Sequence, residues 1–151
     1  MERILLATDF SPASRPAVRE ALGLAKATGA SLVIAHVLEE PIPFSPEGFV
    51  LPRIYDELAQ ALRTQGQKKM RTLLAHACKT GVAATGLLLR GIPHEAIVRA
   101  ARSHAAGRIV IGTHGRSGVS RLILGSVAAK VIAAATCPTL VVPAAKKGGK
   151  R

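Results

Sequence analysis

Short apolar runs alternate with helical patterns along this 151-residue chain. Each run is apolar at nearly every position, which is typical of a strand buried on both faces of a parallel sheet. The five predicted strands are residues 3–8, 31–37, 82–90, 108–111 and 139–142. Because the segments between them have helical spacing, successive strands need right-handed crossovers. The sequence therefore predicts an α/β fold: a single doubly wound domain, with helices on both faces of a five-stranded parallel sheet.

Glycine and proline mark where the helices are expected to begin and end. The first helix is expected to end at Gly29, because glycine readily adopts the left-handed conformation of a helix end. A proline-rich loop, residues 39–52, precedes a long second helix, and its length favours a functional role. Gly66 lies inside that helix and costs about 1 kcal/mol relative to alanine, so we expect a bend or a break there. Pro93 suits the first turn of the third helix.

Composition disfavours several classes of protein. No apolar run approaches the roughly 20 residues that cross a bilayer, and Met1 leads directly into a strand without the pattern of a signal peptide. We therefore expect a cytoplasmic protein without membrane contact. Cys78 and Cys137 match no disulfide framework, and the histidines show no metal-ligand spacing, so no metal site is predicted. We expect one domain over residues 1–145 and a basic, disordered tail at 146–151.

The formal net charge of +12 favours anionic partners of every kind. Four of the positive charges lie in the tail, 146–151, and a solvated basic tail explains them without a partner. No recognisable nucleic-acid motif accompanies the charge, so nucleic-acid or anionic-surface binding ranks below the other functions.

A glycine-rich segment follows the fourth predicted strand. Gly112 and Gly115 come directly after the apolar run, and Gly125 and Ser126 open the next helical pattern. Glycines let the main chain approach an anion closely, and the first N–H groups of a helix have no internal partner. The segment therefore predicts a phosphate site. Asp9 follows the first strand, and it faces the same crevice if the first and fourth strands are neighbours, because ligands bind at the carboxyl ends of parallel strands.

The glycine pattern also carries a family resemblance. Gly112, two residues, Gly115, nine residues, then Gly125 and Ser126 resembles the nucleotide-binding signature of the universal stress protein family, ATP-binding subclass. Further matching landmarks are Ile-Leu-Leu-Ala-Thr-Asp-Phe-Ser near the start, His36-Val37, Gly91-Ile92-Pro93 and Cys137-Pro138-Thr139. The resemblance implies strand order 3-2-1-4-5, ATP as the ligand with Mg²⁺ as a candidate companion ion, and a homodimer formed through Thr139–Val142.

The resemblance also implies roles for single residues. Gly112 and Gly115 would wrap the ribose and phosphates, and Gly125, Ser126 and Val127 would offer backbone N–H groups to the phosphates. Ser126 could instead only cap its helix. Asp9 would hydrogen-bond the adenine or the ribose, and the main chain of Val37 would face the adenine. Thr8 and Pro12 would line the same cleft.

Asp9 has a structural alternative, because aspartate beside Ser11 and Pro12 also favours an Asx turn. His114 and Arg116 lie beside the glycines and are candidate nucleotide contacts; Arg116 could equally be a solvated surface arginine. No acidic partner for His114 is visible in the sequence nearby, so no catalytic residue is predicted.

The leading hypothesis is a cytoplasmic stress-response protein that binds ATP and acts as a nucleotide-dependent switch for an unidentified protein partner. The alternative is a slow ATP hydrolase or nucleotidyl-transfer enzyme that uses the same cleft. The chain lacks a P-loop sequence and an evident carboxylate pair for magnesium near the glycines, so binding is favoured over turnover.

Overall fold

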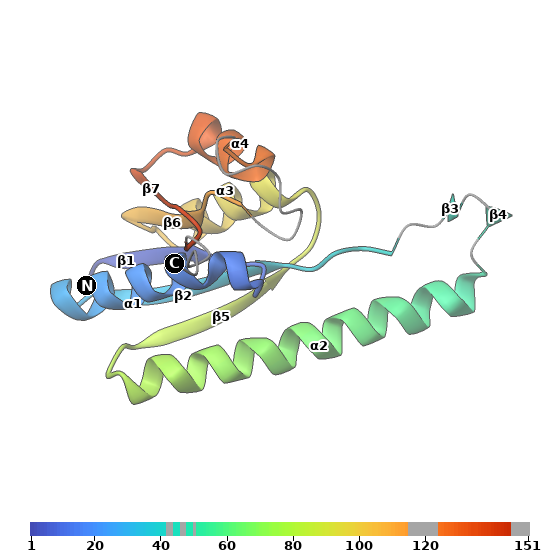
Figure 1. The fold of residues 1–151 in the computed structure, drawn as a ribbon, viewed down its shortest axis with the longest axis horizontal. Coiled ribbons are helices and arrows are strands. Elements are labelled where there is room, and N and C mark those ends of the chain that lie inside the picture. The colour runs from blue at the N-terminus through green and yellow to red at the C-terminus, as the bar shows by residue number, and fades with distance from the viewer. Residues whose placement is uncertain (42–43, 46–47, 50, 115–123, 146–151) are drawn as a thin grey trace, which may run out of the picture.

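Five parallel strands form the centre of the computed structural model, which describes residues 1–41, 44–45, 48–49, 51–114 and 124–145. The strand order is β5-β2-β1-β6-β7, which is 3-2-1-4-5 when the five strands are counted along the chain, so the predicted fold and order are confirmed (Figure 1). The strands of the sheet are β1 (Arg3–Ala7), β2 (Ser31–Val37), β5 (Ala84–Leu89), β6 (Arg108–Gly112) and β7 (Thr139–Val142).

A hydrophobic core lies on each face of this sheet. Successive residues of β1 alternate between the two. Leu6 lies in the first core, which packs against α1 and α2, whereas Leu5 lies in the second core, which packs against α3 and α4. Both side chains are fully buried. This alternation is the two-residue period of a strand, and it explains why a strand covered on both sides is apolar throughout. The helices are α1 (Arg15–Thr28), α2 (Pro52–Lys79), α3 (Pro93–Ser103) and α4 (Ser126–Ala134).

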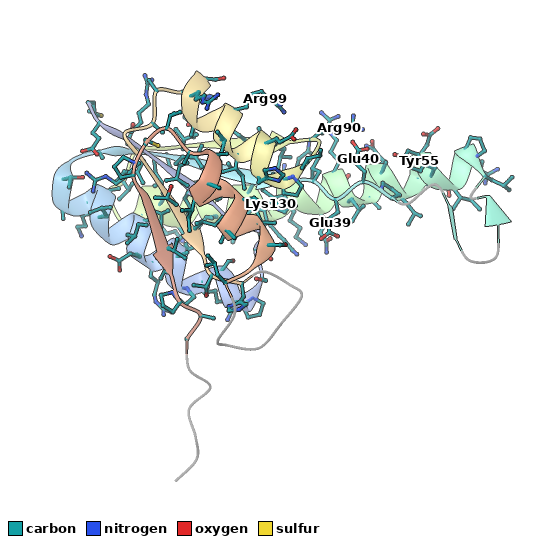
Figure 2. The ribbon with its side chains drawn as sticks, turned by 90° about the horizontal axis from the view of Figure 1, so that it is seen from above. Glu39, Glu40, Tyr55, Arg90, Arg99 and Lys130 are labelled. Atoms are coloured by element: carbon teal, nitrogen blue, oxygen red, sulfur yellow. The ribbon has the colours of Figure 1, made fainter. Side chains whose placement is uncertain are left out.

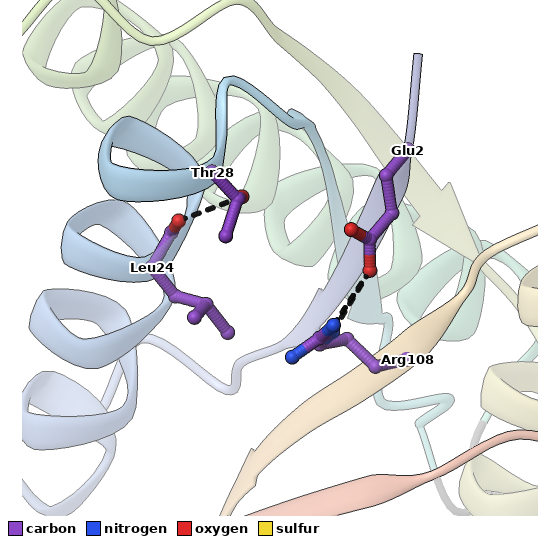
Figure 3. A network of polar contacts seen from close by, with 4 residues as sticks. All are labelled: Glu2, Leu24, Thr28 and Arg108. Carbon is purple, nitrogen blue, oxygen red and sulfur yellow. Dashed lines mark hydrogen bonds and ion pairs between the residues drawn. The ribbon is translucent and has the colours of Figure 1, made fainter.

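The central position of β1 is fixed at both of its edges. It pairs with β2 in the register Leu5↔Val33 and with β6 in the register Leu5↔Ile109. At the amino end of the sheet, Glu2 and Arg108 form an ion pair at 2.8 Å between the starts of β1 and β6 (Figure 3). The first and fourth strands of the sheet are therefore neighbours, as the predicted crevice requires.

Gly66 does not break α2. The helix runs continuously from Pro52 to Lys79, so the expected break at Gly66 is wrong. The reason is packing against the sheet: a Cβ at this position would lie 2.9 Å from Cδ2 of Leu38. Gly66 therefore allows the close approach of α2 to the sheet. Gly29 ends α1 as predicted, because it follows the last turn of that helix in the left-handed conformation, with φ +70°.

The segment predicted as a loop at residues 39–52 contains regular structure. Two short strands, β3 (Phe44–Ser45) and β4 (Gly48–Phe49), pair antiparallel, and α2 already begins at Pro52. Together with the first turns of α2, they extend beyond the sheet (Figure 1). Within the described residues, no helix combines the length and apolar character needed to span a bilayer.

Candidate functional site

A cavity of about 340 Å³ opens at the carboxyl ends of β1, β2 and β6. The structure brings most of the predicted site residues to its walls. The predicted residues that line it are Thr8, Asp9, Val37, Gly112, His114, Gly125, Ser126 and Val127. Pro12 is not among the lining residues; it begins the short 3-10 turn η1 (Pro12–Ser14) instead. Gly115 and Arg116 lie outside the described residues.

The sequence analysis missed four polar residues of the cavity wall: Ser14, His36, Glu39 and Thr113. Glu39 and Thr113 each lie two residues after a predicted strand end, and that position is the signal that could have found them. Apolar wall residues such as Ile97 and Ile111 belong to the second core and gave no signal distinct from ordinary packing.

The turn after β1 is fixed by a chain of hydrogen bonds through two hydroxyl groups. The Phe10 N–H donates to Thr8 Oγ1 at 3.0 Å, and Ser14 Oγ donates to the carbonyl of Ser11 at 2.8 Å. The two hydroxyls are 3.0 Å apart, and because the Ser14 proton is already used, Thr8 is the donor between them. Both protons are thus committed within the protein. Thr8 and Ser14 can therefore only accept hydrogen bonds from a ligand.

This turn also holds Phe10 in an unusual backbone conformation. Phe10 has φ +60°, which a residue other than glycine rarely adopts. Its ring lies 4.6 Å from the ring of His36, centroid to centroid, and His36 Nδ1 donates to the Thr8 carbonyl at 2.9 Å. Since a carbonyl can only accept, this bond places a proton on Nδ1. Sequence and packing together therefore position the Thr8 main chain and side chain at the cavity.

Asp9 forms the Asx turn that the sequence left as an alternative. Its Oδ1 accepts the backbone N–H of Ser11 at 2.9 Å. The residue is nevertheless half-buried and lines the cavity, so the Asx turn does not exclude a contact with a ligand. The wall formed after β1 and β2 thus presents oxygen acceptors, and Glu39 adds a second carboxylate to the lining.

The opposite wall presents donors. Gly125 is the N-cap of α4, and its N–H donates to the Thr113 carbonyl at 2.7 Å. Ser126 is the first helical residue, so the alternative that Ser126 caps its own helix is wrong. The N–H groups of Ser126, Val127 and Ala128 have no acceptor within the helix, and all three residues line the cavity. A helix N-terminus with such groups favours an anion.

His114 also lines the cavity. Its Nδ1 lies 3.0 Å from Thr113 Oγ1, and its Nε2 is buried without a hydrogen-bond partner among the residues that the structure describes. A buried ring nitrogen of this kind gains free energy from a ligand that pairs with it. Over the same described part of the chain, no cluster of three or more histidine, cysteine or acidic residues could hold a metal ion.

A family model, that of the universal stress protein family, matches residues 1–143 of this chain. The chain belongs to the universal stress protein family. Universal stress protein MJ0531 of Methanocaldococcus jannaschii is 34% identical over 146 residues, which cover 97% of this chain and 84% of that protein. The universal stress protein of Thermus aquaticus encoded in the QAH/OAS sulfhydrylase 3′ region is 38% identical over 141 residues, 92% of this chain and 96% of that protein.

Solved structures of the universal stress protein family share the fold. The structure of hypothetical protein MJ0577 has a TM-score of 0.83 and 27% identity, and the match covers 97% of this chain and 98% of that chain. A universal stress protein solved in complex with cAMP has a TM-score of 0.63 and 25% identity, with 95% and 98% covered. In the chain described above, one cavity combines a wall of oxygen acceptors with a wall of helix N–H donors.

Proposed function

We propose that this universal stress protein binds ATP in the cavity and belongs to the ATP-binding subclass. The observation that carries the proposal is the pairing of the two walls. Three N–H groups at the start of α4 suit the phosphates, and the acceptors after β1 and β2 suit the hydroxyl and amino groups of a nucleoside. A family member in complex with cAMP supports an adenine nucleotide as the ligand class.

The proposed orientation follows from these groups. The triphosphate lies at Ser126 and Val127, where the helix dipole favours negative charge. Mg²⁺, as its candidate companion ion, would be held by the phosphate oxygens, since the described residues offer no cluster of metal ligands. The adenine and ribose lie at Asp9 and beside the Val37 main chain. Gly112, at the carboxyl end of β6, lines the cavity between the proposed triphosphate position and the proposed nucleoside position. Gly115, which completes the glycine pattern, and Arg116, which follows it, enter this proposal on the sequence alone.

We propose that nucleotide binding in the cavity acts as a switch that a protein partner in the cytoplasm reads. We also propose that the protein forms a homodimer. Val142 at the end of β7 accepts the Thr113 N–H at 3.0 Å, so the edge strand is tied to the cavity wall. Within the described residues β7 pairs only with β6, and Leu140 on it is 40% exposed. An edge strand of this kind is suited to pair with the same strand of a second copy, through Thr139–Val142.

Calorimetry with ATP and Mg²⁺ tests the binding proposal. We expect saturable binding of ATP, weaker binding of adenosine because it lacks the phosphates, and weaker binding of inorganic triphosphate because it lacks the nucleoside. Phosphate release measured on the same samples separates binding from turnover. Heat signals indistinguishable from buffer at millimolar ATP would sink the proposal.

Asp9→Asn separates ligand contact from the Asx turn. Asparagine keeps an oxygen for the Ser11 N–H, so the turn and the stability of the protein should persist. If the carboxylate also accepts from the nucleoside, the loss of its charge should weaken ATP binding about tenfold. Equal ATP affinity of variant and parent would show that Asp9 serves the turn alone.

A further inference from the structure

Two buried hydroxyl groups, Thr8 Oγ1 and Ser14 Oγ, meet on the wall of the cavity, and we call them the hydroxyl pair. Thr8 is 6% exposed and Ser14 4%, and both residues line the cavity. The two oxygens lie 3.0 Å apart, with the Thr8 proton directed at Ser14 and the Ser14 proton directed at the Ser11 carbonyl. Thr8 Oγ1 also accepts the Phe10 N–H. Among the described residues, each oxygen therefore keeps one acceptor position for a ligand, and neither keeps a proton.

The hydroxyl pair lies between the elements that form the two ends of the cavity. The Thr8 N–H donates to a carbonyl of β2 at 3.0 Å, so Thr8 lies beside the end of that strand. On the other side, a Cβ added to Gly112 at the end of β6 would lie 3.8 Å from Ser14 Cα. The order across the cavity is thus β2, the hydroxyl pair, β6 and α4. Figure 2 labels Glu39, two residues beyond β2, and Lys130 on α4, the elements at the two ends of this order.

The three parts of ATP differ in what they offer to a pair of acceptors. The phosphates only accept hydrogen bonds, and the adenine donates only through its 6-amino group, whereas the ribose donates through its 2′- and 3′-hydroxyls. In the proposed orientation, the phosphates lie at the start of α4 and the adenine lies beside β2. The part of the nucleotide between these two ends is the ribose. Position and hydrogen-bonding chemistry therefore agree on the same part of the ligand.

We propose that the hydroxyl pair selects ribonucleotides by accepting a hydrogen bond from a ribose hydroxyl, an inference that rests on the proposed function. Ser14 acts as the positioning residue, because it takes the Thr8 proton and commits its own proton to the main chain. A sugar substituent that has lone pairs but no proton meets only lone pairs here. The pair is buried and oriented before the ligand arrives, so little rotamer freedom is lost on binding. Sites built in this way reject an analogue that lacks the hydroxyl.

Competition calorimetry of the full chain with ATP and two fluorinated analogues tests the contact. In 2′-fluoro-2′-deoxy-ATP and 3′-fluoro-3′-deoxy-ATP, fluorine takes the place of one hydroxyl, so the sugar keeps nearly the same shape but loses one donor. We expect at least one analogue to bind about tenfold or more weakly than ATP, because a buried acceptor is left without its donor. This comparison needs no variant and so does not depend on whether a substitution folds.

Ser14→Ala tests the role of Ser14 in the same assay. The change removes one acceptor and leaves the Thr8 proton without its partner, so Thr8 Oγ1 can turn that proton toward the ligand. We expect the ratio of ATP affinity to fluoro-analogue affinity to fall at least about threefold from the parent ratio. Both ligands are compared on one variant, so a general loss of stability affects them alike. Ser103→Ala is the matched control, because Ser103 Oγ donates to the Arg99 carbonyl at 2.9 Å on the exposed side of α3, and it should keep the parent ratio.

The outcomes separate this inference from the proposed function. Absence of ATP binding to the parent would contradict the proposed function itself. ATP binding with both fluoro analogues within about fivefold of ATP would overturn the inference alone. A Ser14→Ala ratio equal to the parent ratio would likewise show that the hydroxyl pair does not contact the ribose.

Discussion

Replacing Gly125 with alanine is expected to abolish most ATP binding. A Cβ at this position would lie 2.6 Å from the carbonyl oxygen of Thr113, which is main chain and cannot turn aside. The start of α4 must therefore move, and the Gly125 N–H loses its 2.7 Å bond to the same oxygen. Because hydrogen bonds from helix N–H groups to phosphate contribute about 1.5–3 kcal/mol each, we expect about 100-fold weaker binding by calorimetry.

Gly23→Ala is the matched control for this change. Gly23 lies inside α1, and a Cβ there meets nothing within 4 Å. Alanine should leave ATP affinity unchanged and raise the free energy of unfolding by up to about 1 kcal/mol, because it favours helix. An ATP affinity of Gly125→Ala within twofold of the parent would mean that the phosphates do not lie at the start of α4.

Replacing Thr8 with valine is expected to destabilise the turn after β1. The change keeps the shape of the side chain but removes the hydroxyl, so the Phe10 N–H loses its acceptor and Ser14 Oγ loses its donor. Thr8 and Ser14 are both buried, at 6% and 4% exposure, so water does not readily replace these partners. We expect the free energy of unfolding in urea to fall by about 2–3 kcal/mol.

Thr28→Val is the control for the loss of a threonine hydroxyl. Its Oγ1 donates to the Leu24 carbonyl at 2.9 Å on the exposed side of α1 (Figure 3). Water replaces that bond, so the free energy of unfolding should stay within about 0.5 kcal/mol of the parent value. If Thr8→Val were equally mild, the hydroxyl chain would not be what holds Phe10 in its left-handed conformation.

The strands were predictable because burial on both faces makes a strand apolar at every position. Ser31–Val37 has the predicted bounds for this reason, and the edge strand Thr139–Val142, which is only partly buried, also has the predicted bounds because it is equally apolar. The strand order needed the family resemblance, because periodicity says which segments are strands and not which strands are neighbours. Gly66 could not be interpreted from helix propensity alone. Glycine destabilises an isolated helix, but here the close packing of Gly66 against Leu38, which depends on the tertiary fold, leaves no room for a side chain.

The candidate site was predictable where residues follow a strand or begin a helix. Thr8, Asp9 and Ser126 are of this kind, and all three line the cavity. Ser14 and His36 were missed because their roles depend on partners that the turn after β1 brings near, at 28 residues' separation for the His36 contact with Thr8. Such contacts leave no pattern in the sequence.

The junction at Gly66 divides α2 into two parts that sequence change can alter independently. Among the described residues, none from Glu39 to Gln65 belongs to either hydrophobic core, whereas Met70 and Ala77 are part of the first. Substitutions before the junction therefore leave the sheet and the floor of the cavity intact. The outer part of a single helix can therefore diverge in sequence while the inner part preserves the sheet that carries the ligand site.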